Sequence, residues 1–248
     1  MTKVQRILAR YPEALGLKST KNGGITPLLA AVRGNRLATV QWLITHKKAS
    51  CSECDDLGAT ALIWAAHNGN QPMIEYLLTS GSTIEECGKF GDTALTWAAY
   101  KRHVKLCQWL IEKAGANPYR KDEFGSSIFL WATEGGEFTL IQWLLESGYG
   151  TLDERDADGN TALLIAAKTG YLHLMQPLLE RGAAVDARNN LDEGVLTQAA
   201  MSGNLQLVQW LVNADNSNLR DPSLKEPLFT AIQYNHKHIV QWVVDHSR

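Results

Sequence analysis

The chain has 248 residues, a formal net charge of −2, 20% charged residues and 45% hydrophobic residues. This composition is too apolar for intrinsic disorder and lacks the glycine or proline excess of a fibre or linker. The near-neutral charge argues against a nucleic-acid partner, and four cysteines are too few for a disulfide scaffold. One excess remains, because eight tryptophans outnumber seven tyrosines and five phenylalanines.

Residues 1–20 predict a short amphipathic helix that caps the end of a core. Val4, Ile7, Leu8 and Tyr11 recur at helical spacing, and Pro12 ends the helix. The start has no apolar region typical of a signal peptide, and no segment approaches the roughly 18 consecutive apolar residues that span a bilayer. We therefore expect an intracellular, cytoplasmic protein that has no membrane partner.

From residue 21 onward, a short motif recurs that consists of Gln or Glu, an aromatic residue and an aliphatic residue. Its central positions hold Trp42, Tyr76, Trp109, Trp143, Pro177, Trp210 and Trp242. A second motif, such as Thr60-Ala61-Leu62, precedes the first by half a repeat and stays in phase with it. A regular period of about 33 residues predicts a solenoid of stacked repeats instead of one or two globular domains.

Each repeat has the pattern of a tight turn followed by two helices. A glycine such as Gly58 precedes a Ser or Thr such as Thr60, whose hydroxyl is predicted to cap the first helix. The paired alanines Ala65-Ala66 let a second helix approach closely, and Gly69 is predicted to end the first helix in the left-handed conformation. The second helix carries apolar residues at helical spacing.

These repeats resemble the ankyrin family, whose unit is a β-turn followed by two antiparallel helices with a Thr-Pro-Leu-His-x-Ala-Ala core. The matching stretches are Gly24-Ile-Thr-Pro-Leu-Leu-Ala-Ala, Gly58-Ala-Thr-Ala-Leu-Ile-Trp-Ala-Ala, Gly91-Asp-Thr-Ala-Leu-Thr-Trp-Ala-Ala and Gly159-Asn-Thr-Ala-Leu-Leu-Ile-Ala-Ala. The resemblance implies an all-α helical solenoid of seven helix-turn-helix repeats with β-turn tips, after the N-terminal capping helix at 1–20. The predicted repeats are 21–54, 55–87, 88–121, 122–155, 156–188, 189–220 and 221–248.

Three departures from the family core affect the predicted stability. The family's His is replaced in every repeat, for example by Thr96, so we expect the hydrogen bond that ties turn to helix to be missing throughout. Arg102 stands where a glycine would end the first helix. A left-handed residue of this kind costs about 1–2 kcal/mol, so the turn is either strained or reshaped. Asp192 and Gly194 scramble the turn sequence of the sixth repeat.

The tryptophans fall into two ladders, each at one position of the repeat. Trp64, Trp97 and Trp131 lie on first helices. The second helices carry Trp42, Trp109, Trp143, Trp210 and Trp242. Packing between neighbouring repeats is the favoured interpretation, because each aromatic ring can bury a large area against its neighbour. An exposed aromatic stripe that contacts a partner is the alternative.

The sequence shows no pattern that supports catalysis. Cys51 and Cys54 have a CxxC spacing, but no fourth ligand is apparent beside Cys87, and Cys107 lies in a second helix. We interpret them as reduced thiols and expect neither a metal nor a cofactor. No phosphate-binding loop, dinucleotide fingerprint or nucleophile elbow is present. We therefore expect a protein that is not an enzyme.

Binding is the remaining class of function, and the resemblance implies a protein or peptide partner on the concave face of the solenoid. Exposed apolar side chains ringed by charge favour this interpretation over turn tips that pack only on each other. The predicted contact residues are Leu57, His67, Lys89, Phe90, Asp92, Tyr100, Lys101, Arg102, Glu123, Phe124 and Glu134.

Two other functions stay open. The array could recruit substrates for a larger enzyme or complex, or it could belong to a pathogen effector that engages proteins in the host cytosol. We expect a monomer in each case.

Overall fold

The computed structural model describes residue 10 and residues 15–19, 23–213 and 225–246. These residues form fourteen helices and no strand, apart from isolated β-bridges such as the one between Cys54 and Thr60. The predicted capping helix falls mainly outside the described residues. Contacts within the chain divide it into two compact units, of which unit 1 ends at Glu123 and unit 2 begins at Phe124.

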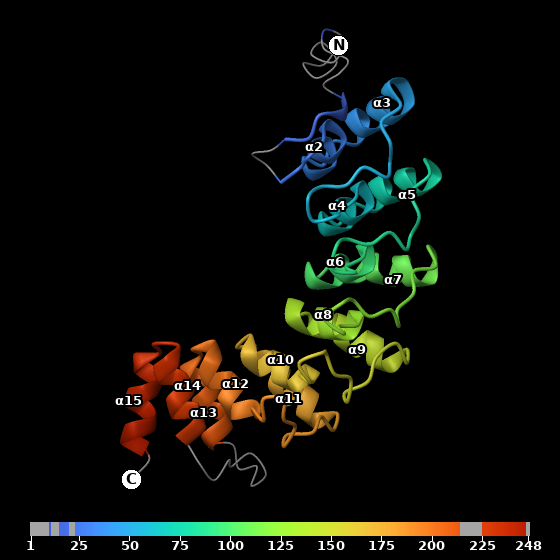
Figure 1. Cartoon of the computed structure of the whole chain (residues 1–248). Coiled ribbons are helices and arrows are strands. Elements are labelled where there is room, and N and C mark those ends of the chain that lie inside the picture. Colours follow the sequence, from blue (N-terminus) through green and yellow to red (C-terminus); the bar gives the residue numbers. More distant parts are fainter. Residues whose placement is uncertain (1–9, 11–14, 20–22, 214–224, 247–248) are drawn as a thin grey trace. The chain divides into compact units, whose positions relative to one another are not determined.

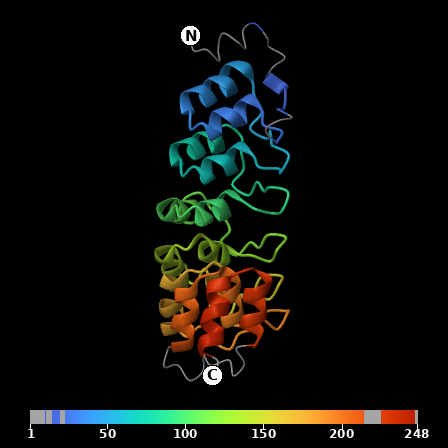
Figure 2. The same cartoon turned by 90° about the vertical axis from the view of Figure 1, so that its left-hand side faces the viewer.

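In unit 1 the described helices form three successive pairs (Figure 1). They are α2 (Pro27–Arg33) with α3 (Leu37–Lys47), α4 (Ala61–His67) with α5 (Gln71–Thr79), and α6 (Ala94–Tyr100) with α7 (Val104–Glu112). The first helix of the middle pair, α4, packs against α2, α5 and α6. The turns between pairs lie along one side of this helix stack (Figure 2).

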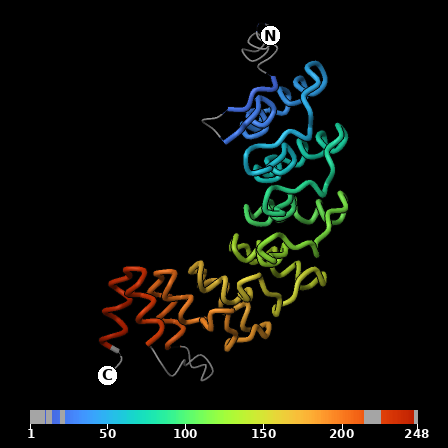
Figure 3. The backbone as a smooth tube through the Cα atoms, viewed as in Figure 1, coloured from blue at the N-terminus to red at the C-terminus, as the bar shows by residue number. Residues whose placement is uncertain are grey.

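Unit 2 repeats the same arrangement of helix pairs (Figure 3). Its described pairs are α8 (Ile128–Gly135) with α9 (Phe138–Glu146), α10 (Ala162–Lys168) with α11 (Leu172–Glu180), α12 (Val195–Ser202) with α13 (Leu205–Asn213), and α14 (Lys225–Gln233) with α15 (Lys237–His246). The first helices α8, α10, α12 and α14 pack in chain order. The helical solenoid predicted from the period is confirmed, and the residue boundaries of the repeats stay a prediction.

The first helices form the core of each unit. In α4 the buried residues occupy most of the helix surface, and they are Ala61, Leu62, Ile63, Ala65 and Ala66. The second helix α5 buries one face only, through Met73, Ile74 and Leu77. An isolated pair could not bury α4, because α4 needs α2 on one side and α6 on the other. The described repeats therefore depend on their neighbours for burial.

Backbone hydrogen bonds join the tips of successive turns. In unit 1, the Lys89 amide donates to the Leu57 carbonyl at 2.8 Å, and the Glu123 amide donates to the Phe90 carbonyl at 2.9 Å. Unit 2 has an equivalent bond, in which the Asn190 amide donates to the Asp158 carbonyl at 2.8 Å. Because these bonds use the backbone, they hold the turn tips at a fixed spacing whatever side chains the tips carry.

A second row of hydrogen bonds joins the region between the first and second helix of one repeat to the C-terminal end of the first helix of the preceding repeat. In each, a side-chain N–H of one repeat donates to a backbone carbonyl 34–37 residues earlier. The pairs are Asn68 with Val32 (2.9 Å), His103 with His67 (3.1 Å), His173 with Gly136 (3.1 Å), Asn204 with Gly170 (2.9 Å) and His236 with Met201 (3.0 Å). These bonds satisfy carbonyls that a helix end leaves without an intrahelical partner.

The expectation that the turn-to-helix hydrogen bond is missing throughout is wrong at one repeat. Thr96 occupies the position of the family's His, and its hydroxyl accepts from the Thr93 amide at 2.8 Å and donates to the Thr93 carbonyl at 3.0 Å. The Thr93 hydroxyl accepts from the Thr96 amide in return, so the two residues form a capping box. A hydroxyl can therefore replace the imidazole at this position.

The predicted hydroxyl caps occur at only some first helices. Thr26 and Thr93 accept the expected bond from the third residue of their helix, whereas Thr60 and Thr161 make no such bond. The Ser127 hydroxyl instead donates to the Glu154 carboxylate in the loop that leads to the next turn. The turn positions do not require the side-chain cap, since the backbone bonds between tips already hold them.

The prediction that Asp192 scrambles its turn is also wrong. Asp192 has φ +63°, close to the +82° of Gly159 at the equivalent position of the preceding repeat. The Asn189 side chain accepts from the Leu191 and Glu193 amides, and these bonds fix the same turn shape. Aspartate is one of the few residues that tolerate the left-handed region, so the turn keeps its geometry.

Arg102 adopts the strained conformation that the sequence left as one of two alternatives, with φ +64°. We predict that Arg102→Gly raises the free energy of unfolding by about 1 kcal/mol, because glycine carries no penalty in this region. Denaturant unfolding measures the change. The matched control is Lys101→Gly at φ −84°, where glycine should lower stability by about 0.5 kcal/mol. Equal effects of the two substitutions would contradict the strain at Arg102.

Candidate functional site

The candidate site is the surface of unit 1 that is formed by the turn tips and the C-terminal ends of α2, α4 and α6, which we call the first-helix face. Two tryptophans at equivalent positions are anchored beneath it. The Trp64 indole donates to Asp55 Oδ2 at 3.0 Å, and the Trp97 indole donates to Asp92 Oδ2 at 2.7 Å. Both aspartates are buried, at 7% and 9% exposure, so each fixes the orientation of its indole ring.

Side chains from the helix ends interleave with these two rings. The His67 ring lies between them, with its centroid 5.2 Å from that of Trp64 and 5.4 Å from that of Trp97. The Arg33 guanidinium lies 4.5 Å above the Trp64 ring, and Tyr100 meets Trp97 edge-on at 5.9 Å. We call Arg33, Trp64, His67, Trp97 and Tyr100 the aromatic ladder, and we keep the names first-helix ladder and second-helix ladder for the two sets of tryptophans. The end residue of α2 or α4 thus contacts the tryptophan of the following first helix, which joins the repeats through side chains.

The electrostatics of the ladder keep its centre uncharged. Burial lowers the pKa of the His67 imidazole, and the nearby Lys101 ammonium lowers it further. The imidazole is therefore neutral at neutral pH, as a ring held between two indoles should be. The positive charges lie at the two ends of the ladder, where Arg33 covers Trp64, and Lys101 Nζ lies 5.2 Å from the Tyr100 ring centroid.

The structure places most of the predicted unit 1 contact residues on the first-helix face. Leu57 is 61% exposed at a turn tip, Phe90 is 40% exposed at the next tip, and Tyr100 is 37% exposed at the end of α6. Lys89, Arg102 and Glu123 are exposed, and His67 and Lys101 are half-buried.

Three of the predicted contact residues are placed differently. Asp92 is buried and supports the Trp97 indole from below the surface. Phe124 and Glu134 are exposed but belong to unit 2, so the first-helix face of unit 1 does not include them.

Sequence reasoning did not identify the residues that hold the ladder in place. Asp55 lies nine residues before its tryptophan, whereas Asp92 lies five residues before its own. The unequal distances leave no periodic signal, although an acidic residue in each turn could have suggested a bond to a following indole. The stacking of Arg33 on Trp64 of the next repeat was also missed, because only the fold shows this contact.

All eight tryptophans are half-buried, including those of the second-helix ladder. On that ladder, Trp42 stacks on His46 at 6.2 Å between ring centroids and lies 5.5 Å from Lys47 Nζ. In unit 2, Trp143 contacts Tyr149 at 5.5 Å. The rings pack on neighbouring side chains, and Trp64 and Trp97 make contacts between repeats. The alternative, an aromatic stripe that contacts a partner, stays a prediction.

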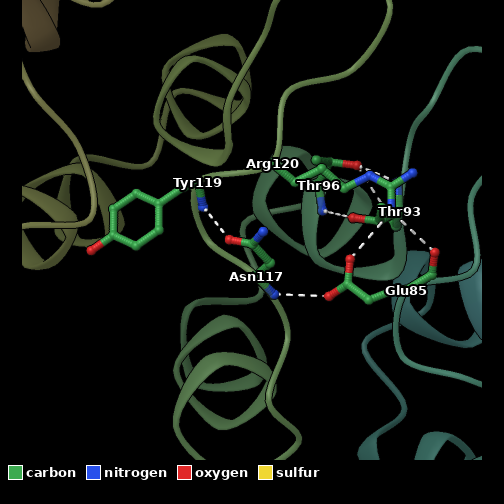
Figure 4. Close-up of polar contacts among 6 residues, drawn as sticks. All are labelled: Glu85, Thr93, Thr96, Asn117, Tyr119 and Arg120. Atoms are coloured by element: carbon green, nitrogen blue, oxygen red, sulfur yellow. Dashed lines mark hydrogen bonds and ion pairs between the residues drawn. The ribbon is translucent and has the colours of Figure 1, made fainter.

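A polar cluster on the loops of unit 1 has a structural role (Figure 4). Glu85 accepts from the Asn117 amide at 2.9 Å, and Arg120 Nη1 lies 3.3 Å from Glu85 Oε2. Tyr119 points away from this ion pair and is 65% exposed. Because the carboxylate and guanidinium are both partly exposed, the pair contributes about 0–1 kcal/mol to stability. The cluster joins the loops of successive repeats.

The cysteines show no sign of activation. Burial raises the pKa of the Cys51 and Cys107 thiols, which keeps both in the unreactive protonated form. Among the described residues, no three His, Cys, Asp or Glu side chains are grouped so that they could hold a metal ion. None of the described helices is long and apolar enough to cross a membrane.

Comparison with protein families now assigns the fold. The model for "Ankyrin repeats (3 copies)" matches residues 3–86, 28–122 and 95–189. The chain belongs to the ankyrin repeat family. Ankyrin repeats generally mediate protein–protein interaction and are generally not catalytic. A comparison with curated proteins gave no significant match.

The bond between Trp97 and Asp92 provides a test of how this ankyrin face is held in place. Trp97→Phe keeps an aromatic ring but leaves the buried Asp92 carboxylate without its indole donor. The matched control is Trp42→Phe, a half-buried tryptophan whose indole donates to no other group in the described residues. We predict that Trp97→Phe lowers the free energy of unfolding by about 1.5 kcal/mol more than the control does, measured by denaturant unfolding. Equal losses would show that the Asp92 bond does not hold the ring.

Proposed function

We propose that this chain is a non-enzymatic interaction module that binds a protein or peptide on the first-helix face of unit 1. The observation that carries the proposal is the exposure of Leu57, Phe90 and Tyr100 beside the anchored aromatic ladder. Exposed aromatic side chains on a rigid support are typical of binding interfaces, because they are large and lose little conformational freedom on binding.

The turn tips that carry two of these side chains are already ordered. The backbone bond from Lys89 N to Leu57 O sets the distance between the tips that carry these two residues. The bond from Glu123 N to Phe90 O sets the distance from the Phe90 tip to the following tip. A partner therefore meets apolar groups at fixed positions, and binding does not have to order a loop. Such preorganisation favours recognition of an extended peptide or of a protein surface.

Charged residues complete the proposed surface. Lys89, Arg102 and Glu123 are exposed around the apolar side chains, an arrangement that favours a polar rim around an apolar centre. His67 is the centre of the ladder, Lys101 lies beside its Tyr100 end, and Asp92 supports the surface from below. Phe124 and Glu134 are proposed as contacts made separately by unit 2.

The two narrower functions use the same face. A substrate-recruiting part of an enzyme or complex and a pathogen effector in the host cytosol would both bind their targets through these side chains. We propose a monomer in the cytoplasm, with neither a nucleic acid nor a membrane as partner and with no cofactor. Affinity purification from the native cell, followed by assays on the purified pair, identifies the target.

The triple variant Leu57→Ala/Phe90→Ala/Tyr100→Ala tests the proposed face. We predict that it weakens binding of the purified partner by more than about 2 kcal/mol, because the variant removes the exposed anchors. Calorimetry or fluorescence anisotropy measures the affinity, and unfolding curves show that the fold is kept. Tyr119→Ala removes an aromatic side chain that is exposed outside the face, and it should leave the affinity unchanged. Unchanged binding by the triple variant would reject the face.

A further inference from the structure

The charges at the first-helix ends of unit 1 are all of one sign. The stretches that follow or end α2, α4 and α6 are residues 33–36, 67–70 and 100–103. They contain no Asp or Glu, and their charged residues are Arg33, Arg36, Lys101 and Arg102. The first corresponding stretch of unit 2, residues 134–137, contains two glutamates and no Lys or Arg. The fold therefore does not require basic residues at this position.

Two of these cations are held by the aromatic ladder. The Arg33 guanidinium lies over the Trp64 ring at 4.5 Å from its centroid, and Lys101 Nζ lies 5.2 Å from the Tyr100 ring and 6.0 Å from the Trp97 ring. A guanidinium stacked on an aromatic face keeps the N–H groups at its edge available to an anion. Stacking also restricts the side chain in advance, which lowers the entropy cost of binding.

Neither cation is neutralised by a carboxylate of the described residues. In the part of the chain that the structure describes, Arg33 and Lys101 form no ion pair with a carboxylate. Arg33 is exposed and Lys101 is half-buried, so both can be reached from solvent. The carboxylates that lie beneath this face, those of Asp55 and Asp92, are buried and accept from the indoles.

We propose that the partner on the first-helix face of unit 1 presents an acidic peptide segment, with one carboxylate bound by Arg33 and a second bound by Lys101. This inference rests on the proposed function and specifies its partner chemistry. Arg33 ends α2, and Lys101 directly follows α6, with α4 between these helices. Helices pack about 8–10 Å apart, so the ends of α2 and α6 that carry the two cations are separated by about 20 Å. An extended peptide covers that distance in about six residues.

A single-stranded nucleic acid is the other polyanion that could meet a basic aromatic surface, and the structure disfavours it. Such proteins stack bases on open aromatic faces, whereas Arg33 covers Trp64 and His67 lies between the two indoles. The turn tips beside the ladder carry charges of both signs, with Asp56, Lys89 and Glu123 all exposed, so they do not form the continuous basic groove that follows a phosphate backbone. A peptide can instead alternate acidic and apolar residues to match cations and apolar tips.

The test is a selection from a displayed library of random peptides of about twelve residues, with the whole chain as bait. We expect the recovered peptides to carry an excess of Asp and Glu, with two acidic positions about six residues apart. One recovered peptide is then synthesised with each acidic residue in turn replaced by its amide, Glu→Gln or Asp→Asn. Each replacement should weaken binding by about ten-fold, since a charge-assisted hydrogen bond is lost.

The protein side of the test uses Arg33→Gln/Lys101→Gln, which should reduce the affinity for the acidic peptide by about a hundred-fold, or ten-fold for each contact. The matched control is Lys47→Gln, which removes a cation that lies over Trp42 of the second-helix ladder at 5.5 Å. The control should bind as the native chain does. Unfolding curves of both variants separate a loss of binding from a loss of fold.

Each other outcome has a distinct meaning. Recovered peptides that are neutral or basic, or that bind the double variant as tightly as the native chain, overturn the acidic-partner inference and leave the proposed function standing. If no peptide binds, the acidic-peptide inference fails, and the triple variant with the purified native partner still decides the proposed function. If the Leu57→Ala/Phe90→Ala/Tyr100→Ala variant binds the peptides unchanged, the proposed face itself fails. If a random single-stranded oligonucleotide binds and Arg33→Gln/Lys101→Gln abolishes its binding, while no acidic peptide is recovered, the ligand is a nucleic acid instead.

Discussion

The structure depends on one constraint, which is that a helix pair of this chain cannot bury its own first helix. In α4 the side chains on almost every side are apolar, and the neighbouring helices α2, α5 and α6 cover them. Burial therefore couples each repeat to the next, and the small alanines at positions 65 and 66 allow the helices to approach closely. The hydrogen bonds between turn tips and between helix ends follow from that close stacking, since they form only when adjacent repeats keep a constant distance.

The same stacking turns a tryptophan excess into a rigid surface. Trp64 and Trp97 are half-buried at the edge of the core, where Arg33, His67 and Tyr100 contact their rings. Their indoles are tied to buried aspartates, and His67 fills the space between the rings. The ladder is therefore both a contact between repeats and a support for the exposed side chains beside it. A chain that used Leu at these positions would pack its core but would provide no ordered platform for a cation.

The regular period of the sequence was sufficient to predict the helices, because burial, turn and helix end recur together in each repeat. It also located left-handed positions, including Gly69 and Arg102. Sequence reasoning failed where one chemical group replaces another, as Thr96 does for the family's His and Asp192 does for glycine. It failed also for contacts without a fixed spacing, such as Asp55 with Trp64. Packing determines which charged side chains are exposed and which support a ring. The buried role of Asp92 therefore could not be predicted from its position in the repeat.

The central claim is that a ligand binds where the first-helix tryptophans lie, and the indole N–H signals in an NMR spectrum of the protein test it most directly. Each of the eight tryptophans contributes one signal, which single Trp→Phe variants assign. The account predicts that adding the selected peptide shifts the signals of Trp64 and Trp97 and leaves that of Trp42, on the second-helix ladder, in place. Shifts confined to second-helix tryptophans would contradict the account.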